Sequence, residues 1–289
     1  MKRFLAVLLL LCLLVPALTA GAEVYVKKTP PEDWQERALL RITVFRTGEG
    51  DCMLLECGGE SMMIDGGPYK YREKLRDALK DRGISRLKYL FSTHPHADHI
   101  EGLRMLMQYG FEVDEFLSVF PKDKSDKEGN QKKAMAALDK AGIPFRQISS
   151  GEVLTLGDAE ITVYNWPEGE TINAQSAMAR LVYGDCSALF TADIIGETQK
   201  YFLDALGPEA LKADVVKAPH HGLKAFVPEF LDAVDPAFVW ITNYHGKSIS
   251  STEGQLERRK LPMMYSGDGT VVLESDGTDW YVIQNLYQF

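Results

Sequence analysis

Histidine is concentrated in two short segments of this chain. Three of the six histidines lie in residues 93–99, which read THPHADH, and two more lie in residues 219–222, which read PHHG. Imidazole and carboxylate groups are the usual ligands of Zn²⁺, Fe²⁺ and Mn²⁺ where thiolates are missing. Histidines scattered through a core or a surface would not cluster in this way, so the spacing predicts a metal centre. The alternative is a surface loop that binds metal only opportunistically.

The order of these side chains indicates how two ions could be held. His94 and His96 are two residues apart and share one face of an extended chain. Asp98 and His99 follow after a turn and can reach a second ion. A carboxylate placed between two divalent ions can bridge them. The candidate metal ligands are His94, His96, Asp98, His99, Asp193 and His220.

Apolar segments must deliver these groups to one place. Residues 87–92 read LKYLFS and predict a buried strand that ends at the histidine cluster; residues 187–192 and 215–218 predict strands that deliver Asp193 and His220. Two groups of strands mixed with helices predict an α/β fold with two sheets face to face and helices outside. Further strands are predicted at residues 42–45, 53–55, 62–64, 116–120, 153–156, 161–164, 177–183, 238–242, 269–274 and 280–283, and helices at 71–81, 101–109, 132–141, 197–206, 226–233 and 252–259.

The N-terminus has the pattern of a signal peptide. Lys2 and Arg3 precede an apolar run at residues 4–15, and Ala20-Gly21-Ala22 matches a cleavage site. We therefore expect residues 1–22 to direct export, leaving a secreted or extracytoplasmic protein with no transmembrane helix. An uncleaved anchor is the alternative. Residues 23–37 form a polar lead-in, and residues 38–289 are expected to form one domain.

Charge and cysteine content argue against a protein that binds long nucleic acids and against a disulfide-stabilised scaffold. Without residues 1–22, the chain has 30 basic and 41 acidic residues, because the segment removes two of the 32 Lys and Arg and no acid; the net charge is −11. Proteins that act on long nucleic acids usually carry a basic surface. Residues 122–133 contain five lysines but also three acids, which favours a solvated loop. Cys52, Cys57 and Cys186 form no disulfide framework.

Several motifs together resemble one family. The His94-Pro-His96-Ala-Asp98-His99 segment resembles the H-x-H-x-D-H signature of the metallo-β-lactamase superfamily. More narrowly, the chain looks like the soluble hydrolase domain of ComEC-type DNA-uptake proteins and their free-standing relatives. The other matching segments, in the order of that family, are GEGDC at 48–52, MIDGG at 63–67, NAQS at 173–176, LFTAD at 189–193 and VKAPHHG at 216–222.

The resemblance implies a fold and a distribution of ligands. The fold is the αββα four-layer metallo-β-lactamase sandwich. His94 and His96 would hold the first ion, and Asp193 would bridge to the second. Asp98, which is also a candidate catalytic residue, would hold the second ion together with His99 and His220. Asp65 would orient the ligands from behind.

The chain departs from the superfamily at one expected ligand. Many members have a further histidine between the main cluster and the bridging Asp, whereas residues 173–176 here contain none. Water or His245 would complete the first ion's shell, and occupancy would be one or two ions, with Zn²⁺ expected first and Mn²⁺ second. His221 and His245 are candidate substrate contacts.

The function that this pattern favours is an exported metal-dependent hydrolase in which a divalent ion lowers the pKa of a water toward about 7. Its expected substrate is a phosphodiester, either a small one or a nucleic acid. One alternative is a hydrolase of carbon esters, lactones or β-lactams, and another is a non-catalytic binding protein on the same scaffold. No obligate protein partner can be inferred from the sequence.

Overall fold

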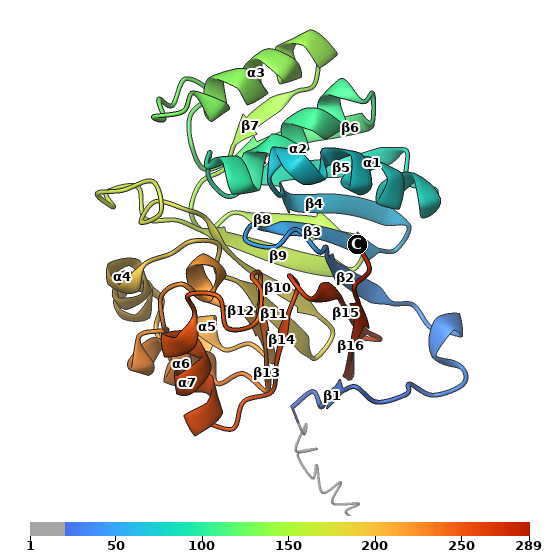
Figure 1. Ribbon diagram of the computed structural model, residues 1–289, viewed down its shortest axis with the longest axis vertical. Coiled ribbons are helices and arrows are strands. Elements are labelled where there is room, and N and C mark those ends of the chain that lie inside the picture. The colour runs from blue at the N-terminus through green and yellow to red at the C-terminus, as the bar shows by residue number, and fades with distance from the viewer. Residues whose placement is uncertain (1–20) are drawn as a thin grey trace, which may run out of the picture.

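The computed structural model describes residues 21–289, and most of the predicted signal peptide lies outside these residues. Two β-sheets face each other, with helices on both outer sides (Figure 1). This is the four-layer α/β arrangement that the sequence predicts. Among residues 21–289, no helix has the length and apolar character needed to cross a membrane.

The first sheet is built mainly from the N-terminal half of the chain. Its strand order within residues 21–289 is β1-β16-β15-β2-β3-β4-β5-β6-β7. Strands β4, β5, β6 and β7 run parallel to one another, whereas β2, β3 and β4 form an antiparallel meander. The bounds are β1 Val24–Val26, β2 Leu40–Val44, β3 Cys52–Cys57, β4 Glu60–Gly66, β5 Arg86–Ser92, β6 Glu112–Ser118, β7 Phe145–Gln147, β15 Gly269–Ser275 and β16 Trp280–Leu286.

The second sheet comes from the C-terminal half. Its order is β14-β13-β12-β11-β10-β9-β8, and β11, β12, β13 and β14 are parallel. Antiparallel pairing joins β8 to β9, β9 to β10 and β10 to β11. The bounds are β8 Val153–Leu156, β9 Ala159–Tyr164, β10 Met178–Tyr183, β11 Cys186–Phe190, β12 Val215–Lys217, β13 Phe238–Ile241 and β14 Met263–Tyr265.

The helices form the two outer layers. Helices α1 Arg72–Asp81, α2 Ala97–Gln108 and α3 Asn130–Ala141 cover the first sheet. The second sheet is covered by the other four α-helices of the described chain, α4 Gly196–Leu206, α5 Pro208–Leu211, α6 Pro228–Val234 and α7 Ser250–Arg258. Short 3-10 turns occur at η1 Trp34–Glu36, η2 Tyr69–Tyr71 and η3 Pro219–Gly222.

Three apolar clusters hold these layers together. The central one packs side chains of both sheets against each other, for example Ile42 and Leu55 with Ile161 and Leu181. The other two lie between each sheet and its helices. Cys52, Cys57 and Cys186 are buried and unpaired, as expected of small apolar side chains.

Two local differences from the sequence prediction matter. Helix α2 begins at Ala97 rather than at residue 101, so Asp98 and His99 belong to its first turn. An acidic residue in a first turn is favoured by the helix dipole. The lead-in also joins the domain, because β1 pairs with β16 and Trp34 is buried. Both features depend on tertiary contacts that local patterns do not reveal.

Candidate metal centre

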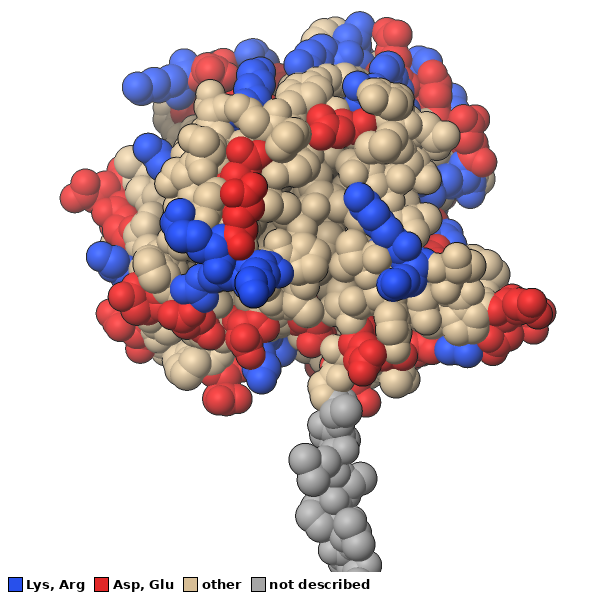
Figure 2. Space-filling model, turned by 60° about the horizontal axis from the view of Figure 1, so that its bottom comes forward, with Lys and Arg blue, Asp and Glu red and all other residues tan. Residues whose placement is uncertain are grey.

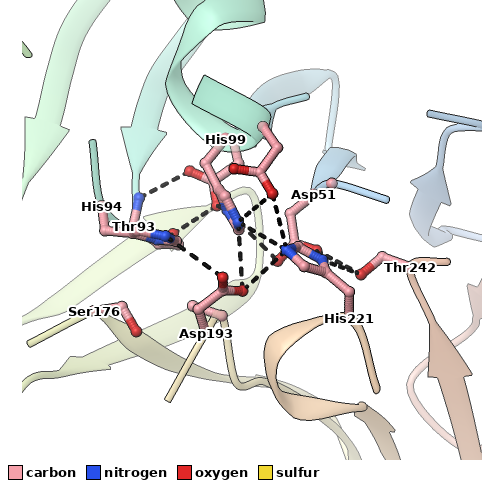
Figure 3. Close-up of polar contacts among 12 residues, drawn as sticks. Asp51, Thr93, His94, His99, Ser176, Asp193, His221 and Thr242 are labelled. Carbon is pink, nitrogen blue, oxygen red and sulfur yellow. Dashed lines mark hydrogen bonds and ion pairs between the residues drawn. The ribbon is translucent and has the colours of Figure 1, made fainter. Parts of the chain in front are cut away.

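Both sheets present polar side chains at one common edge. On the first sheet, Asp65 lies near the end of β4, and the histidine cluster follows β5. On the second sheet, Asp193 follows β11 and η3 follows β12. These neighbouring strands are parallel, so their carboxyl ends meet at the same edge, which is where ligands bind in open α/β sheets. Figure 3 shows the side chains converging from both sheets.

Asp193 lies at the centre of the cluster. Its Oδ2 is 3.6 Å from His94 Nε2 and 3.6 Å from His220 Nε2. Its Oδ1 is 3.4 Å from His99 Nε2 and 3.3 Å from His221 Nε2. Each oxygen of one carboxylate therefore faces two imidazoles, an arrangement suited to bridging two cations. Oδ1 is also buried with no hydrogen-bond partner among the described residues, which a bound cation would correct.

The side of Oδ1 has the dimensions of a tetrahedral ion site. His99 Nε2 and His221 Nε2 are 3.2 Å apart, and Asp98 Oδ2 lies 3.2 Å from His221 Nε2 and 3.9 Å from His99 Nε2. A tetrahedral Zn²⁺ with bonds of about 2.0–2.1 Å separates its ligand atoms by about 3.3–3.5 Å. The residues present therefore fit a divalent ion here. We name this the second position.

The side of Oδ2 is bordered by the other two histidines of the cluster. His94 Nε2 and His96 Nδ1 are 3.1 Å apart. Together with Asp193 these histidines form a group whose ligand atoms lie within 4.8 Å of one another. We name this the first position. The structure thus offers sites for two divalent ions that share one carboxylate.

Asp65 orients two of these histidines. It accepts hydrogen bonds from the Thr93 hydroxyl at 2.6 Å and the Thr93 backbone N–H at 2.9 Å, and its Oδ2 lies 2.8 Å from His99 Nδ1. The Thr93 hydroxyl therefore accepts from His94 Nδ1, at 3.0 Å. Both imidazoles are therefore held through Nδ1 and direct Nε2 at the site. Asp65 thus contacts the Nδ1 side of His99 directly and that of His94 through Thr93.

A second acid does the same for His221. Thr242 donates its hydroxyl hydrogen to Asp51 Oδ1 at 2.7 Å, so its oxygen accepts from His221 Nδ1 at 2.9 Å. Asp51 Oδ2 is 3.1 Å from Nζ of the buried Lys217. Although Asp51 can be grouped with His99 and His221 as a metal ligand, it faces their Nδ1 atoms, on the opposite side of the rings from the Nε2 cluster. We therefore interpret Asp51 as an orienting group.

The charges of the cluster stabilise one another. Burial alone would lower the pKa of His99 and His221, but the carboxylate of Asp193, with Asp65 and Asp98 near His99 and Asp51 near His221, holds both pKa values well above the ordinary value. In spite of burial, His221 and His99 keep the pKa of Asp193 well below its usual range. Burial lowers the pKa of His94 and His220. The carboxylate of Asp193 is therefore ionised and available to a cation.

Two histidines lie elsewhere than predicted. His221, expected as a substrate contact, occupies the place beside Asp98 and His99 that the resemblance gave to His220. His220 instead faces the Oδ2 side of Asp193. The side chain of His245 is 70% exposed and lies 3.7 Å from Glu253, and no contact among residues 21–289 joins it to the cluster. Sequence reasoning gave Asp51 no role, because its partners Lys217 and Thr242 come from distant segments.

Comparison with known proteins agrees with this geometry. The family described as Metallo-beta-lactamase superfamily matches residues 46–234, more than half of the chain. The chain belongs to the metallo-beta-lactamase superfamily. In this superfamily the fold and the acid–imidazole cluster are those of a metal-dependent hydrolase. No curated protein resembles the chain closely enough to count as a match.

Solved structures show the same fold at low identity. The metallo-beta-lactamase fold protein YhfI from Bacillus subtilis is 16% identical, with a TM-score of 0.54, and the match covers 82% of this chain and 100% of that one. CmlA, a diiron beta-hydroxylase from Streptomyces venezuelae, is 12% identical with a TM-score of 0.52, and 89% of this chain matches 55% of that one. The chain thus spans about half the length of CmlA. These likenesses establish the superfamily fold.

Proposed function

We propose that this superfamily member is an exported phosphodiesterase that acts on small or single-stranded substrates. The observation that carries the proposal is a pocket of about 570 Å³ beside the first position. Its size suits a nucleotide-sized ligand. Its lining residues are His96, Asp126, Lys127, Glu128, Thr171, Ile172, Asn173 and Ile195.

Lys127 is the group of this pocket that could bind an anionic substrate, beside two acids that are hydrogen-bonded within their own loop. Asp126 accepts backbone hydrogen bonds from Asn130 and Gln131 at the start of α3, and Glu128 accepts one from the Asn130 side chain. Both acids are therefore engaged within their own loop. Lys127 has no ion-pair partner among residues 21–289 and is available to a phosphate oxygen. Ile172 and Ile195 offer an apolar wall for the organic part of the substrate.

The surface charge limits the size of the substrate. The whole chain has a net charge of −9. On the face in Figure 2, Lys and Arg form small groups with Asp and Glu among them. Binding of a long duplex normally depends on a continuous basic surface. A small or single-stranded phosphodiester therefore agrees better with the charges than a duplex does.

The residues divide the chemistry between them. Divalent ions at the two positions would activate a water and polarise a phosphoryl oxygen. Asp65 and Asp51 keep the Nε2 atoms of His99 and His221 directed at the site. His96 lies at the boundary between site and pocket, where the scissile group would enter. Export of the mature chain from residue 23 is part of the proposal, and N-terminal sequencing of extracytoplasmic protein tests it.

The decisive experiment compares substrates on metal-loaded protein. We expect hydrolysis of bis-p-nitrophenyl phosphate with Zn²⁺ or Mn²⁺, and a loss of at least about a thousandfold in His96→Ala, because that variant removes a ligand at the pocket. Preferential hydrolysis of p-nitrophenyl butyrate or of a β-lactam would contradict the proposal and favour a carbon-ester hydrolase. Metal binding without turnover of any of these would favour a binding protein.

A further inference from the structure

We infer that the tandem histidines of η3 each hold a different ion, and that His220 supplies the first-position ligand that residues 173–176 lack. The inference rests on the proposed metal-dependent function only in that it requires bound ions. It changes the predicted distribution, in which His220 belonged to the second position. It also explains how this chain can hold two ions without the intermediate histidine.

The backbone of η3 is held in an unusual conformation. His220 has φ 48° and ψ 50°, and His221 has φ 55° and ψ 22°, so two consecutive non-glycine residues are left-handed. This conformation is strained for residues other than glycine, and such strain persists where the surroundings enforce it, often at functional sites. The backbone N–H of His220 donates to Ala192 O at 2.9 Å, and that of Leu223 donates to His220 O at 2.9 Å.

The consequence is that both rings face the same carboxylate. Neighbouring residues of an extended strand point to opposite sides. Here the two ring centroids are 5.9 Å apart, with their planes at 67°. His221 Nε2 lies near Oδ1 of Asp193, at 3.3 Å, and His220 Nε2 lies near Oδ2, at 3.6 Å. One turn thus delivers an imidazole to each side of the bridging group.

The first position has the remaining ligands in place. Asp193 Oδ2 is 3.6 Å from both His94 Nε2 and His220 Nε2, and His94 Nε2 is 3.1 Å from His96 Nδ1. These separations are close to the value of about 3.3–3.5 Å around a tetrahedral ion. His94, His96 and Asp193 have ligand atoms within 4.8 Å of one another, and His220 Nε2 reaches this position through its approach to Asp193 Oδ2. In this assignment His220 is the third imidazole there.

Asn173 is the only competing side chain that the 173–176 segment brings to His220. Its Nδ2 lies 3.3 Å from His220 Nε2, and its Oδ1 is buried without a hydrogen-bond partner among the described residues. The Asn173 amide oxygen is therefore the alternative ligand that an experiment must separate from His220.

The most direct test is the crystal structure of the full mature chain loaded with Zn²⁺. We expect two anomalous peaks, one of them about 2.0–2.1 Å from His94 Nε2, His96 Nδ1 and His220 Nε2. A peak at the first position with His220 Nε2 more than about 3 Å away would overturn the inference. So would a peak at the second position that His220, rather than His221, coordinates. This test needs no substitution and does not depend on a variant's folding.

Three variants provide the second measurement, with Zn²⁺ content determined by plasma mass spectrometry after folding is verified by circular dichroism. We expect the His220→Ala variant to bind about one Zn²⁺ ion per chain instead of about two. Its crystals should retain the anomalous peak beside His99. We expect His221→Ala to retain the peak beside His94 instead. Asn173→Ala is the matched control and should keep both. Loss of the first ion in Asn173→Ala but not in His220→Ala would assign that ligand to Asn173.

The outcome can be separated from that of the proposed function. Two correctly placed ions in a protein that cleaves no phosphodiester would refute the function and leave the ligand assignment intact. Phosphodiester cleavage by a protein whose crystals show no ion beside His94 would refute the ligand assignment and leave the proposed function intact.

Discussion

At the scale of single residues, the centre is controlled by groups that do not touch the ion positions. Lys217 is fully buried, and its Nζ contacts Asp51 Oδ2 at 3.1 Å and donates to the backbone oxygens of Ala192 and Ala218. The same residue therefore neutralises the acid that orients His221 and holds the backbone just before Asp193 and just before η3. Burial of this charge is tolerated because Nζ donates two hydrogen bonds and lies beside an anionic carboxylate.

Replacing Lys217 should expose this dependence. We expect Lys217→Met to lower the free energy of unfolding by about 3–5 kcal/mol, because Asp51 would remain buried without its cation. Zn²⁺ affinity should fall about 10–100-fold. Chemical denaturation and competitive metal titration measure the two effects. The double variant Asp51→Asn/Lys217→Met should lose less stability than the sum of the two single variants. Strictly additive losses would contradict the pairing of Asp51 with Lys217.

Lys127 acts on the substrate rather than on the protein. We expect Lys127→Ala to raise KM for an anionic phosphodiester about fivefold, the equivalent of about 1 kcal/mol for an exposed ion pair, with little change in kcat. Lys132→Ala is the matched control, since Lys132 lies on α3 outside this pocket. Steady-state kinetics at fixed ionic strength makes the comparison. Equal effects of the two substitutions would show only a general loss of positive charge.

The sequence predicts the identity of the ligands better than their distribution. The spacing of residues 93–99 alone indicates a metal centre, since its members are close in the chain. The assignment of His220 and His221 could not be predicted, because it depends on two left-handed residues that only the surrounding structure enforces. Asp51 could not be identified either, since its contact with Thr242 spans 191 residues. The available signal for a buried acid was Lys217, a lysine at the end of the apolar strand β12.

At the scale of elements, α2 carries the ligands Asp98 and His99 and must lie directly on β4. It can do so because glycine occurs on both sides of the contact. A Cβ at Gly102 would lie 1.8 Å from Gly66 O, and the Gly102 N–H donates to Gly67 O at 3.0 Å. This close approach brings His99 Nδ1 to Asp65, which lies on β4 itself. The element contact and the metal centre are therefore linked.

Gly102→Ala tests that link. We expect it to lower the free energy of unfolding by about 3 kcal/mol, at the upper end of overpacking costs, and to weaken Zn²⁺ binding because α2 must move away from β4. Gly254→Ala is the matched control in the interior of α7, where the nearest atom to the new Cβ is the flexible end of Arg258. That substitution should stabilise by up to about 1 kcal/mol. Unchanged metal affinity in Gly102→Ala would separate the helix contact from the site.

At the scale of the whole molecule, the metal centre joins the two halves of the chain. The second position takes Asp98 and His99 from α2 on the first sheet and His221 from the turn after β12 of the second. Sequence patterns predict the two sheets and their helices well, because each half carries its own apolar periodicity. They do not predict that β1, from the polar lead-in, extends the first sheet by pairing with β16. An edge strand of only three residues is too short to show a recognisable alternation of apolar and polar residues.

Because ligands come from both sheets, removing the ions should loosen the whole fold. At a free Zn²⁺ concentration about a thousand times Kd, binding stabilises the native state by about 4 kcal/mol, so chelation should lower the Tm by about 10 °C for a chain of this size. Differential scanning calorimetry before chelation, after chelation and after Zn²⁺ is restored measures this change. The double variant His220→Ala/His221→Ala, which lacks one ligand at each position, should respond much less to the chelator. An unchanged Tm in the native chain after verified metal removal would mean that packing between the sheets alone holds this edge closed, and that the ions serve chemistry without serving stability.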